Sequence, residues 1–124
     1  MPCLTILTNV PRSKIPTDFV NKIMPLLSRV VGKEIDKFTC IISGDCQVSF
    51  GGESTKPGAV ATLESIGNLN PQQNRVIVKE LSDFLDKEIN VKPDRFFLSL
   101  YDVPSSNIGR FGDTSEARLK LSIN

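Results

Sequence analysis

The chain has 124 residues, of which 40% are hydrophobic and 23% charged, and its formal net charge is +1. These values are typical of one globular domain; they argue against disorder, and they give no basic patch that would bind nucleic acid. No apolar stretch approaches the roughly 20 residues that span a bilayer, and no signal-peptide pattern is present, so we expect a cytoplasmic protein without membrane insertion, whose secretion would need an unconventional route.

The first half of the chain predicts a strand followed by an amphipathic helix. Residues 3–8 alternate as a strand does, and a proline-rich loop follows them. Apolar residues then recur at helical spacing over 19–31, where Thr17 and Asp18 can cap the start and Gly32 can end the helix.

Pro25 falls inside this predicted helix. An interior proline removes one backbone hydrogen bond and clashes with a carbonyl one turn earlier, at a cost of about 3 kcal/mol. Because the apolar stripe continues through Pro25, we expect one helix with a kink. A second strand is expected at 38–43, with a short continuation at 48–50.

The second half repeats this order of elements. A third strand is expected at 59–66, a second helix with apolar positions from Val76 to Ile89, and a fourth strand at 96–101. An offset of 58 residues aligns the two halves: Phe19 with Ile77, Ile23 with Leu81, Leu26 with Phe84, Leu27 with Leu85, Val31 with Ile89, and 36–38 with 94–96.

Such self-similarity indicates one strand–helix–strand unit used twice, each with a right-handed crossover and parallel strands. The sequence therefore predicts an α/β fold, in which two βαβ repeats form a four-stranded sheet with two helices on one face. The other face would be uncovered although the strands are apolar on both sides in places, as at 40–42. A homo-oligomer of closed symmetry would cover it.

Several motifs resemble those of the family of macrophage migration inhibitory factor and D-dopachrome tautomerase. In order, they are "MP…TNVP", "GK", "SFGG", "SIG", "NR" and "PDRFFLSLYD…NIG". The resemblance implies a single domain over 1–114, followed by an extension at 115–124. It also implies a homotrimer whose sheets surround a central channel, removal of Met1, and a catalytic N-terminal proline.

The residue types present limit the chemistry. The chain has no histidine, and the spacing of its three cysteines matches no metal site or CxxC motif. Histidine-based acid–base catalysis, Ser-His-Asp and Cys-His systems and histidine-containing zinc sites are therefore excluded, and we expect no cofactor and no metal. A base must come from elsewhere.

The resemblance identifies that base as Pro2. Its amine would be free once Met1 is removed, and it could move a proton between carbon and oxygen in keto–enol tautomerism. To act at neutral pH the amine needs a lowered pKa, because a prolyl amine is intrinsically basic. Apolar neighbours (Cys3, Leu4, Ile66) and the cation Lys33 would both disfavour its protonated form.

Lys33 matches the family lysine that binds the substrate's carboxylate or enolate oxygen, and Ile66 matches an isoleucine of the pocket wall. Each also has an ordinary structural interpretation. A lysine at the end of a helix is favoured by the helix dipole, and an isoleucine at a strand end is a core residue.

Two positions depart from the family pattern. Where the family places a tyrosine and an asparagine from the neighbouring subunit in the pocket, this chain has Phe97 and Ser99. Phe97 keeps the aromatic wall without the hydroxyl, and Ser99 is too short to replace the amide. Each lost hydrogen bond costs roughly 0.5–1.5 kcal/mol, so we expect weaker binding of phenolic keto acids.

Further charged positions admit two interpretations. Lys37 and Arg110 stand at rim positions that are often aromatic in relatives; they would favour acidic substrates or would be solvated surface charges. Arg12 and Asp45 match charges that face the receptor in the family's cytokine member. The cytokine's CxxC is absent, because residues 57–60 read "PGAV".

In the extension at 115–124, apolar and polar residues alternate from Arg118 to Ile123. This pattern predicts a half-buried strand that would add to a sheet edge or lie over a neighbouring subunit, near the pocket, and a frayed tail is the alternative.

The leading hypothesis is an enzyme, a keto–enol tautomerase that converts small carbonyl or α-keto carboxylate compounds of the phenylpyruvate or dopachrome type. The alternative is a cytokine-like ligand of a cell-surface receptor, with a vestigial pocket. A ferredoxin-like regulatory domain, suggested by the βαβ repeat alone, is a third interpretation.

Overall fold

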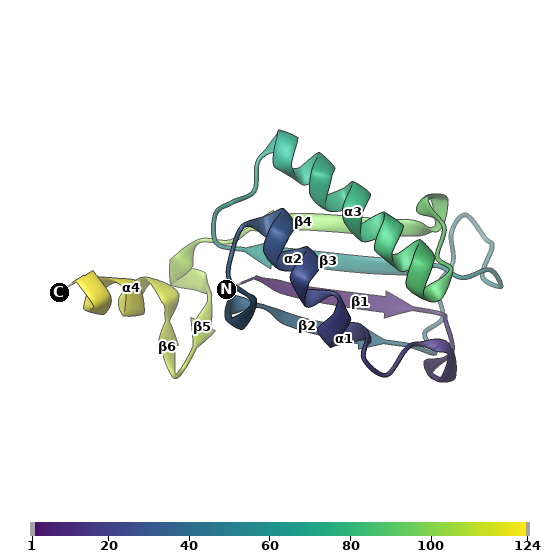
Figure 1. The fold of residues 1–124 in the computed structure, drawn as a ribbon, viewed down its shortest axis with the longest axis horizontal. Helices are drawn as coiled ribbons and strands as arrows, with labels where there is room; N and C mark the ends of the chain where they lie inside the picture. Colours follow the sequence, from purple (N-terminus) through teal and green to yellow (C-terminus); the bar gives the residue numbers. More distant parts are fainter. Residues whose placement is uncertain (1, 124) are drawn as a thin grey trace.

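A computed structural model describes residues 2–123 of the chain, and their side chains as far as residue 120. The fold is mixed α/β, as predicted (Figure 1). In chain order the elements are β1 (Cys3–Thr8), α1 (Phe19–Lys22), α2 (Met24–Val31), β2 (Thr39–Ser43), β3 (Ala59–Ser65), α3 (Pro71–Ile89), β4 (Phe96–Asp102), β5 (Gly109–Arg110), β6 (Asp113–Thr114) and α4 (Ser115–Ile123).

Strands β1 to β4 form one sheet in the order β2-β1-β3-β4. The outer pairs, β1 with β2 and β3 with β4, are parallel, whereas the two central strands are antiparallel, with Thr5 opposite Thr62. Figure 1 shows α1, α2 and α3 over one face of the sheet, and the segment from β5 to α4 extending beyond its end. The predicted four-stranded sheet of two βαβ repeats is confirmed.

The 58-residue repeat extends to the turns between the elements. A 3-10 turn at Ile35–Lys37 precedes β2, and its counterpart at Pro93–Arg95 precedes β4. Helices α2 and α3 end in residues with left-handed backbone, Gly32 (φ 76°) and Asn90 (φ 59°). Glycine and asparagine adopt this conformation most readily, so both helices stop at equivalent points.

The first helix is interrupted rather than kinked, which corrects the sequence-based expectation. Helix α1 ends at Lys22, and α2 starts at Met24 with Pro25 in its first turn. A proline is tolerated there because the first-turn N–H groups of a helix have no intrahelical acceptor. Asp18 occupies the N-cap position of α1, but its side chain makes no capping bond; its carbonyl accepts from Lys22 N at 2.8 Å instead.

The core lies between the helices and the covered face of the sheet. It includes the repeat-related pairs Phe19 with Ile77 and Leu27 with Leu85, all of which are buried. The Phe19 ring meets Phe84 edge-on, with ring centroids 5.4 Å apart, so α1 and α3 pack against each other at this point.

The opposite face of the sheet carries exposed apolar side chains. Leu7, Ile41, Val60, Phe97 and Tyr101 come from all four strands and are each more than one-third exposed. Their positions alternate with those of the core residues, as the pleat requires. The uncovered apolar face expected from the sequence is therefore present in the single chain.

Arg95 secures the long connection between β2 and β3. This side chain is buried and forms no ion pair with a carboxylate of the described residues. It donates instead to the carbonyls of Glu53 (3.0 Å), Lys56 (2.7 Å) and Pro57 (3.3 Å). Its guanidinium also lies 4.9 Å from the centroid of the Phe50 ring. One cation thus ties three carbonyls of this loop to the turn that precedes β4.

Truncating Arg95 to methionine is expected to lower the free energy of unfolding by about 2–4 kcal/mol, because three carbonyls lose a charged donor. Arg95→Lys should recover only part of this loss, since an ammonium cannot reproduce the planar fork of donors. Urea unfolding at fixed protein concentration measures both. Equal stability of Arg95→Met and the parent chain would contradict the assignment.

Two other local predictions are wrong. The stretch at 48–50 forms no strand; Phe50 makes only an isolated bridge to Glu53, because the chain turns back at once through two glycines. The extension forms helix α4 rather than a strand or a frayed tail. Thr114 Oγ1 caps it by accepting from Ala117 N at 3.1 Å, and Glu116 pairs with Lys120 one turn later, at 3.3 Å.

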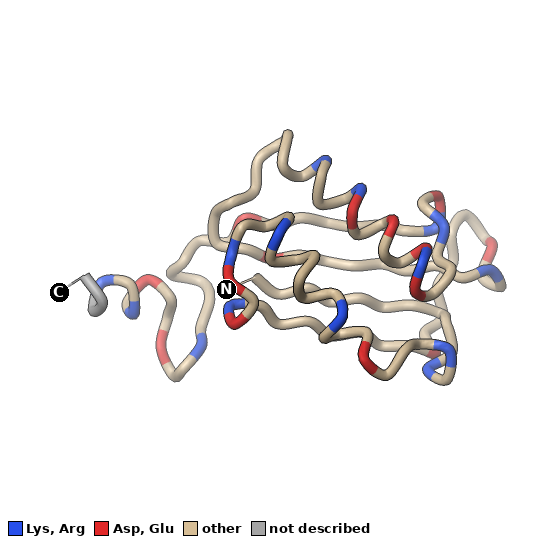
Figure 2. The backbone as a smooth tube through the Cα atoms, viewed as in Figure 1, with Lys and Arg blue, Asp and Glu red and all other residues tan. Residues whose placement is uncertain are grey.

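Acidic and basic residues are interspersed along α3 and the loops, as Figure 2 shows. Within residues 2–123, no helix is both long and apolar enough to cross a membrane. The same part of the chain contains no group of three or more Cys, Asp or Glu residues placed to hold a metal ion.

Candidate functional site

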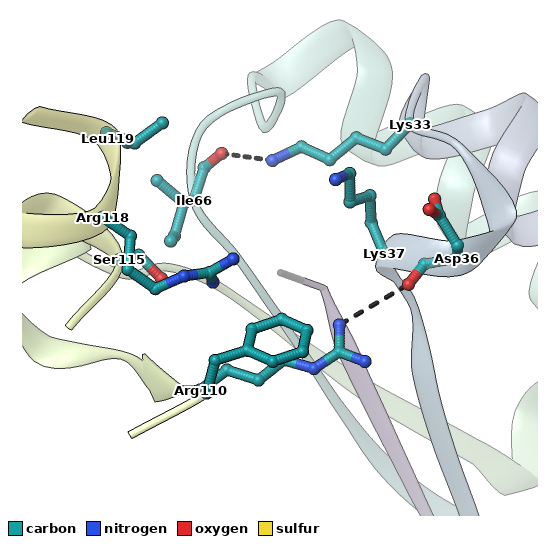
Figure 3. Close-up of a pocket in the computed structure, with 9 residues that line it drawn as sticks. Lys33, Asp36, Lys37, Ile66, Arg110, Ser115, Arg118 and Leu119 are labelled. Carbon is teal, nitrogen blue, oxygen red and sulfur yellow. Dashed lines mark hydrogen bonds between the residues drawn. The ribbon is translucent and has the colours of Figure 1, made fainter. Parts of the chain in front are cut away.

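Lys33 and Ile66 meet at the end of the sheet where β1 begins and β3 ends. The left-handed Gly32 turns the chain away from α2, and Ser28 Oγ donates to the Lys33 carbonyl at 2.6 Å. The Lys33 ammonium then donates to the Ile66 carbonyl at 2.7 Å, a contact drawn in Figure 3. Two residues on different connections are thereby joined by one hydrogen bond.

Pro2 lies buried at the same end of the sheet. Its carbonyl accepts from Thr39 N at 3.0 Å, which ties it to the start of β2. On its other side, Cys3 pairs with the residue that precedes Ser65 on β3. Continuing this antiparallel register by one residue sets Pro2 opposite Ser65 and next to Ile66. Pro2, Lys33 and Ile66, all predicted site residues, are therefore brought together.

Burial lowers the pKa of Lys33, and the negative charge of Asp102 partly opposes this shift. Asp102 also accepts from Gly67 N at 3.0 Å, which holds the turn that follows Ile66. Sequence analysis did not identify Asp102. It is the last residue of the motif "PDRFFLSLYD", to which no role for Asp102 was assigned.

A cavity of about 650 Å³ opens beside Lys33 and Ile66. Lys37 and Arg110, the two rim positions, line it, and Arg110 donates to the Asp36 carbonyl at 3.5 Å. Figure 3 shows Lys33 and Lys37 on one side of this cavity and Arg110 on another. Both rim cations thus face a cavity, although they are exposed.

Four further lining residues come from the C-terminal segment and were missed by sequence analysis: Phe111, Ser115, Arg118 and Leu119. They reach the cavity because β5, β6 and α4 lie beyond the end of the sheet where Lys33 and Ile66 meet (Figures 1 and 3). Sequence analysis predicted the extension as a strand over a sheet edge or a neighbouring subunit near the pocket, but it assigned none of these four residues to the site.

Phe97 and Ser99 do not join this cluster within one chain. They pair with Val60 and Thr62, near the middle of the β3–β4 ladder, while Lys33 lies at the end of that ladder. Phe97 is 58% exposed on the uncovered face. These two residues are therefore presented outward, away from their own chain's cavity.

The family model for macrophage migration inhibitory factor (MIF) matches residues 1–116. The chain belongs to the macrophage migration inhibitory factor family. It is 35% identical over 114 residues to macrophage migration inhibitory factor of Xenopus tropicalis, and the aligned residues cover 92% of this chain and 98% of that protein. A homologue from Trichinella spiralis is 33% identical over the same length, covering 92% and 99%.

Solved structures agree with this assignment. The macrophage migration inhibitory factor of Trichinella spiralis superposes with a TM-score of 0.86 at 30% identity, covering 90% of this chain and 98% of that one. The structure from Oncomelania hupensis gives the same TM-score at 24% identity and covers 99% of this chain, which supports the fold alone. Proteins of the macrophage migration inhibitory factor family are generally tautomerases, and membership supports a cytokine or tautomerase function in general.

Proposed function

We propose that the chain is a tautomerase of small α-keto carboxylates of the phenylpyruvate or dopachrome type, in which Pro2 is the general base. The observation that carries the proposal is the contact of Lys33 with Ile66 at the end of β3, beside buried Pro2 and at the edge of a cavity. The cation that would bind a carboxylate lines this cavity, and the amine that would accept a proton lies behind the lining residues, at the same end of the sheet. The base requires removal of Met1.

The reaction needs only proton transfer. Lys33 binds the substrate's carboxylate or keto oxygen; an ammonium has three donors, so its bond to Ile66 leaves capacity for this contact. The Pro2 nitrogen takes a proton from the carbon next to the carbonyl, and the electron pair moves to oxygen as the enolate forms. Returning the proton to oxygen completes the enol, and the reverse order regenerates the keto form. Burial and the nearby cation favour the neutral amine that this step needs.

We further propose a homotrimer in which each pocket is completed by the neighbouring copy. The uncovered apolar face of the sheet supports association, and Phe97 and Ser99 stand on that face. In this arrangement Phe97 of the neighbouring copy supplies an aromatic wall without a hydroxyl. Light scattering should report three chains, and a monomer would contradict the shared pocket.

The test of the activity uses protein whose intact mass shows that Met1 is absent. The ketonisation of phenylpyruvate enol, followed by ultraviolet absorbance, should be faster than in buffer. Protein that retains Met1 is the control, because its Pro2 nitrogen is an amide and cannot accept a proton. No acceleration by the Met1-free protein would overturn the proposal.

The lowered pKa of Lys33 predicts a pH dependence of ligand binding. Only the ammonium form holds a carboxylate, so the dissociation constant of 3-phenylpropionate should rise as the pH approaches the lowered pKa, below the ordinary value of 10.5. In Lys33→Arg this rise should be absent, because a guanidinium stays protonated. Calorimetric titration at several pH values measures it, and identical profiles for the two proteins would contradict the role of Lys33.

A receptor ligand is the second candidate function. Arg12 and Asp45 are both exposed, and the Arg12 backbone N–H donates to Asp45 Oδ2 at 3.3 Å, so the two predicted receptor-facing charges form one surface. Binding of labelled protein to macrophages should fall in Arg12→Ala and persist in Pro2→Gly. Binding that is insensitive to Arg12→Ala would contradict this candidate.

A further inference from the structure

The cavity beside Lys33 contains more positive charge than one substrate carboxylate requires. Among the described residues that line it are four cations, Lys33, Lys37, Arg110 and Arg118, and one carboxylate, Asp36. Figure 3 shows Lys33 and Lys37 on the side of the cavity formed by the first helical repeat, and Arg110 and Arg118 on the side formed by the C-terminal segment. The cations are thus divided between two walls.

Phe111 holds the second pair of cations in place. The Arg110 guanidinium lies 4.7 Å from the centroid of its ring, and that of Arg118 lies 4.3 Å away. Phe111 itself has a left-handed backbone (φ 59°), which is costly for a bulky residue. Contacts of this kind attract cations to an aromatic ring and restrict their orientations. The two guanidinium groups are therefore arranged about one ring at the cavity wall.

Ser115 adds an independent observation. It lines the same cavity, it is buried, and its Oγ has no hydrogen-bond partner among the described residues. A buried hydroxyl without a partner is destabilising, because no hydrogen bond offsets the loss of its contact with water. A ligand oxygen in the cavity would supply that partner, because a hydroxyl donates readily to an anionic acceptor.

We propose that Arg110, Arg118 and Ser115 form a second anion-binding subsite, which selects substrates with an acidic group at the end remote from the α-keto carboxylate. The inference rests on the proposed function for the reacting end of the substrate. Lys33 holds the keto acid at one wall, and the guanidinium groups bind a second carboxylate or phosphate at the other, through the paired donors that suit such groups. The aliphatic and aromatic side chains of Ile66, Leu119 and Phe111 contact the body of the substrate between the two charges.

The first experiment compares two para-substituted phenylpyruvates of nearly equal size, one with a carboxylate and one with a neutral carboxamide. In the parent protein kcat/KM should be roughly three- to tenfold higher for the carboxylate. An exposed ion pair would give a ratio near the lower value, and a charge-assisted hydrogen bond a ratio near the higher one. Arg118→Gln and Arg110→Gln should each reduce this ratio toward one, and Arg118→Lys should keep part of it. A para-phosphate substrate tests whether phosphorylated compounds bind better still.

Lys120→Gln is the matched control. Lys120 lies on the same helix as Arg118 and loses the same charge, but it does not line the cavity, so the preference should persist. Equal kcat/KM values for the two substrates in the parent protein would overturn the proposal. So would a preference that survives Arg110→Gln combined with Arg118→Gln.

A binding measurement separates failure of the subsite from failure of the proposed reaction. Terephthalate should bind more tightly than 4-carbamoylbenzoate in calorimetric titration, and Arg118→Gln should remove the difference. If no keto acid reacts but this difference is found, the subsite stands and the tautomerase proposal fails. If keto acids react but terephthalate has no advantage, the second subsite is refuted and the reaction stands.

Discussion

Pro2→Gly is expected to slow the enol–keto conversion of phenylpyruvate by about 10²- to 10⁴-fold, the range that a general base contributes. Glycine leaves a flexible primary amine in place of a secondary amine held on a rigid ring. The fold should survive, because the bond from Thr39 N uses only the backbone carbonyl of residue 2. Light scattering should therefore give the same number of chains as the parent protein.

Two controls make this result specific. Intact mass must show that Met1 is absent from both proteins, since a retained methionine would block either amine. Pro11→Gly makes the same replacement in an exposed loop, away from Lys33 and Ile66, and should keep the parent rate. An unchanged rate in Pro2→Gly would assign the base to another residue.

Ile77→Ala is expected to lower the free energy of unfolding by about 2–5 kcal/mol, the cost of an empty volume in a packed core. Ile77 lies in the N-terminal half of α3, is 0% exposed, and corresponds to Phe19 in the 58-residue repeat. The surrounding residues belong to helices and strands that cannot close on the gap without losing their own contacts. Urea unfolding at constant protein concentration measures the loss, because association would add its own concentration dependence.

Ile35→Ala removes the same atoms from a side chain that is 50% exposed in the turn before β2. It should cost less than about 1 kcal/mol, because little apolar surface returns to water. Similar losses in Ile77→Ala and Ile35→Ala would contradict the assigned core.

Local patterns in the sequence predicted most of the secondary structure. Apolar spacing located the strands and α3, and the 58-residue repeat predicted both βαβ units, because burial on one face imposes a period on the chain. The errors occurred where a local sequence pattern was compatible with two different structures. Pro25 could bend one helix or stand in the first turn of another. After Thr114, the alternation of apolar and polar residues favoured a strand, whereas the Thr114 cap and the ion pair between Glu116 and Lys120 favour a helix.

The candidate site depended on sequence in a different way. Pro2, Lys33 and Ile66 were identified through motifs, and their proximity follows from the sheet order, which joins the starts of β1 and β2 to the end of β3. Asp102 ends the motif "PDRFFLSLYD" but received no role from it, and no motif marks the other residues, Phe111, Ser115, Arg118 and Leu119. They matter because their elements end at or extend past the same edge of the sheet.

By itself, the sequence determined the fold class, the uncovered apolar face and the absence of histidine chemistry, since each depends on residue type and period alone. Only the tertiary structure decided what surrounds Lys33. A cavity is formed by side chains from separate segments, and the arrangement of those segments depends on the packing of the whole chain rather than on any local pattern. The positive wall from Arg110 to Arg118 exists because the C-terminal segment lies beside the end of the sheet at which Lys33 meets Ile66.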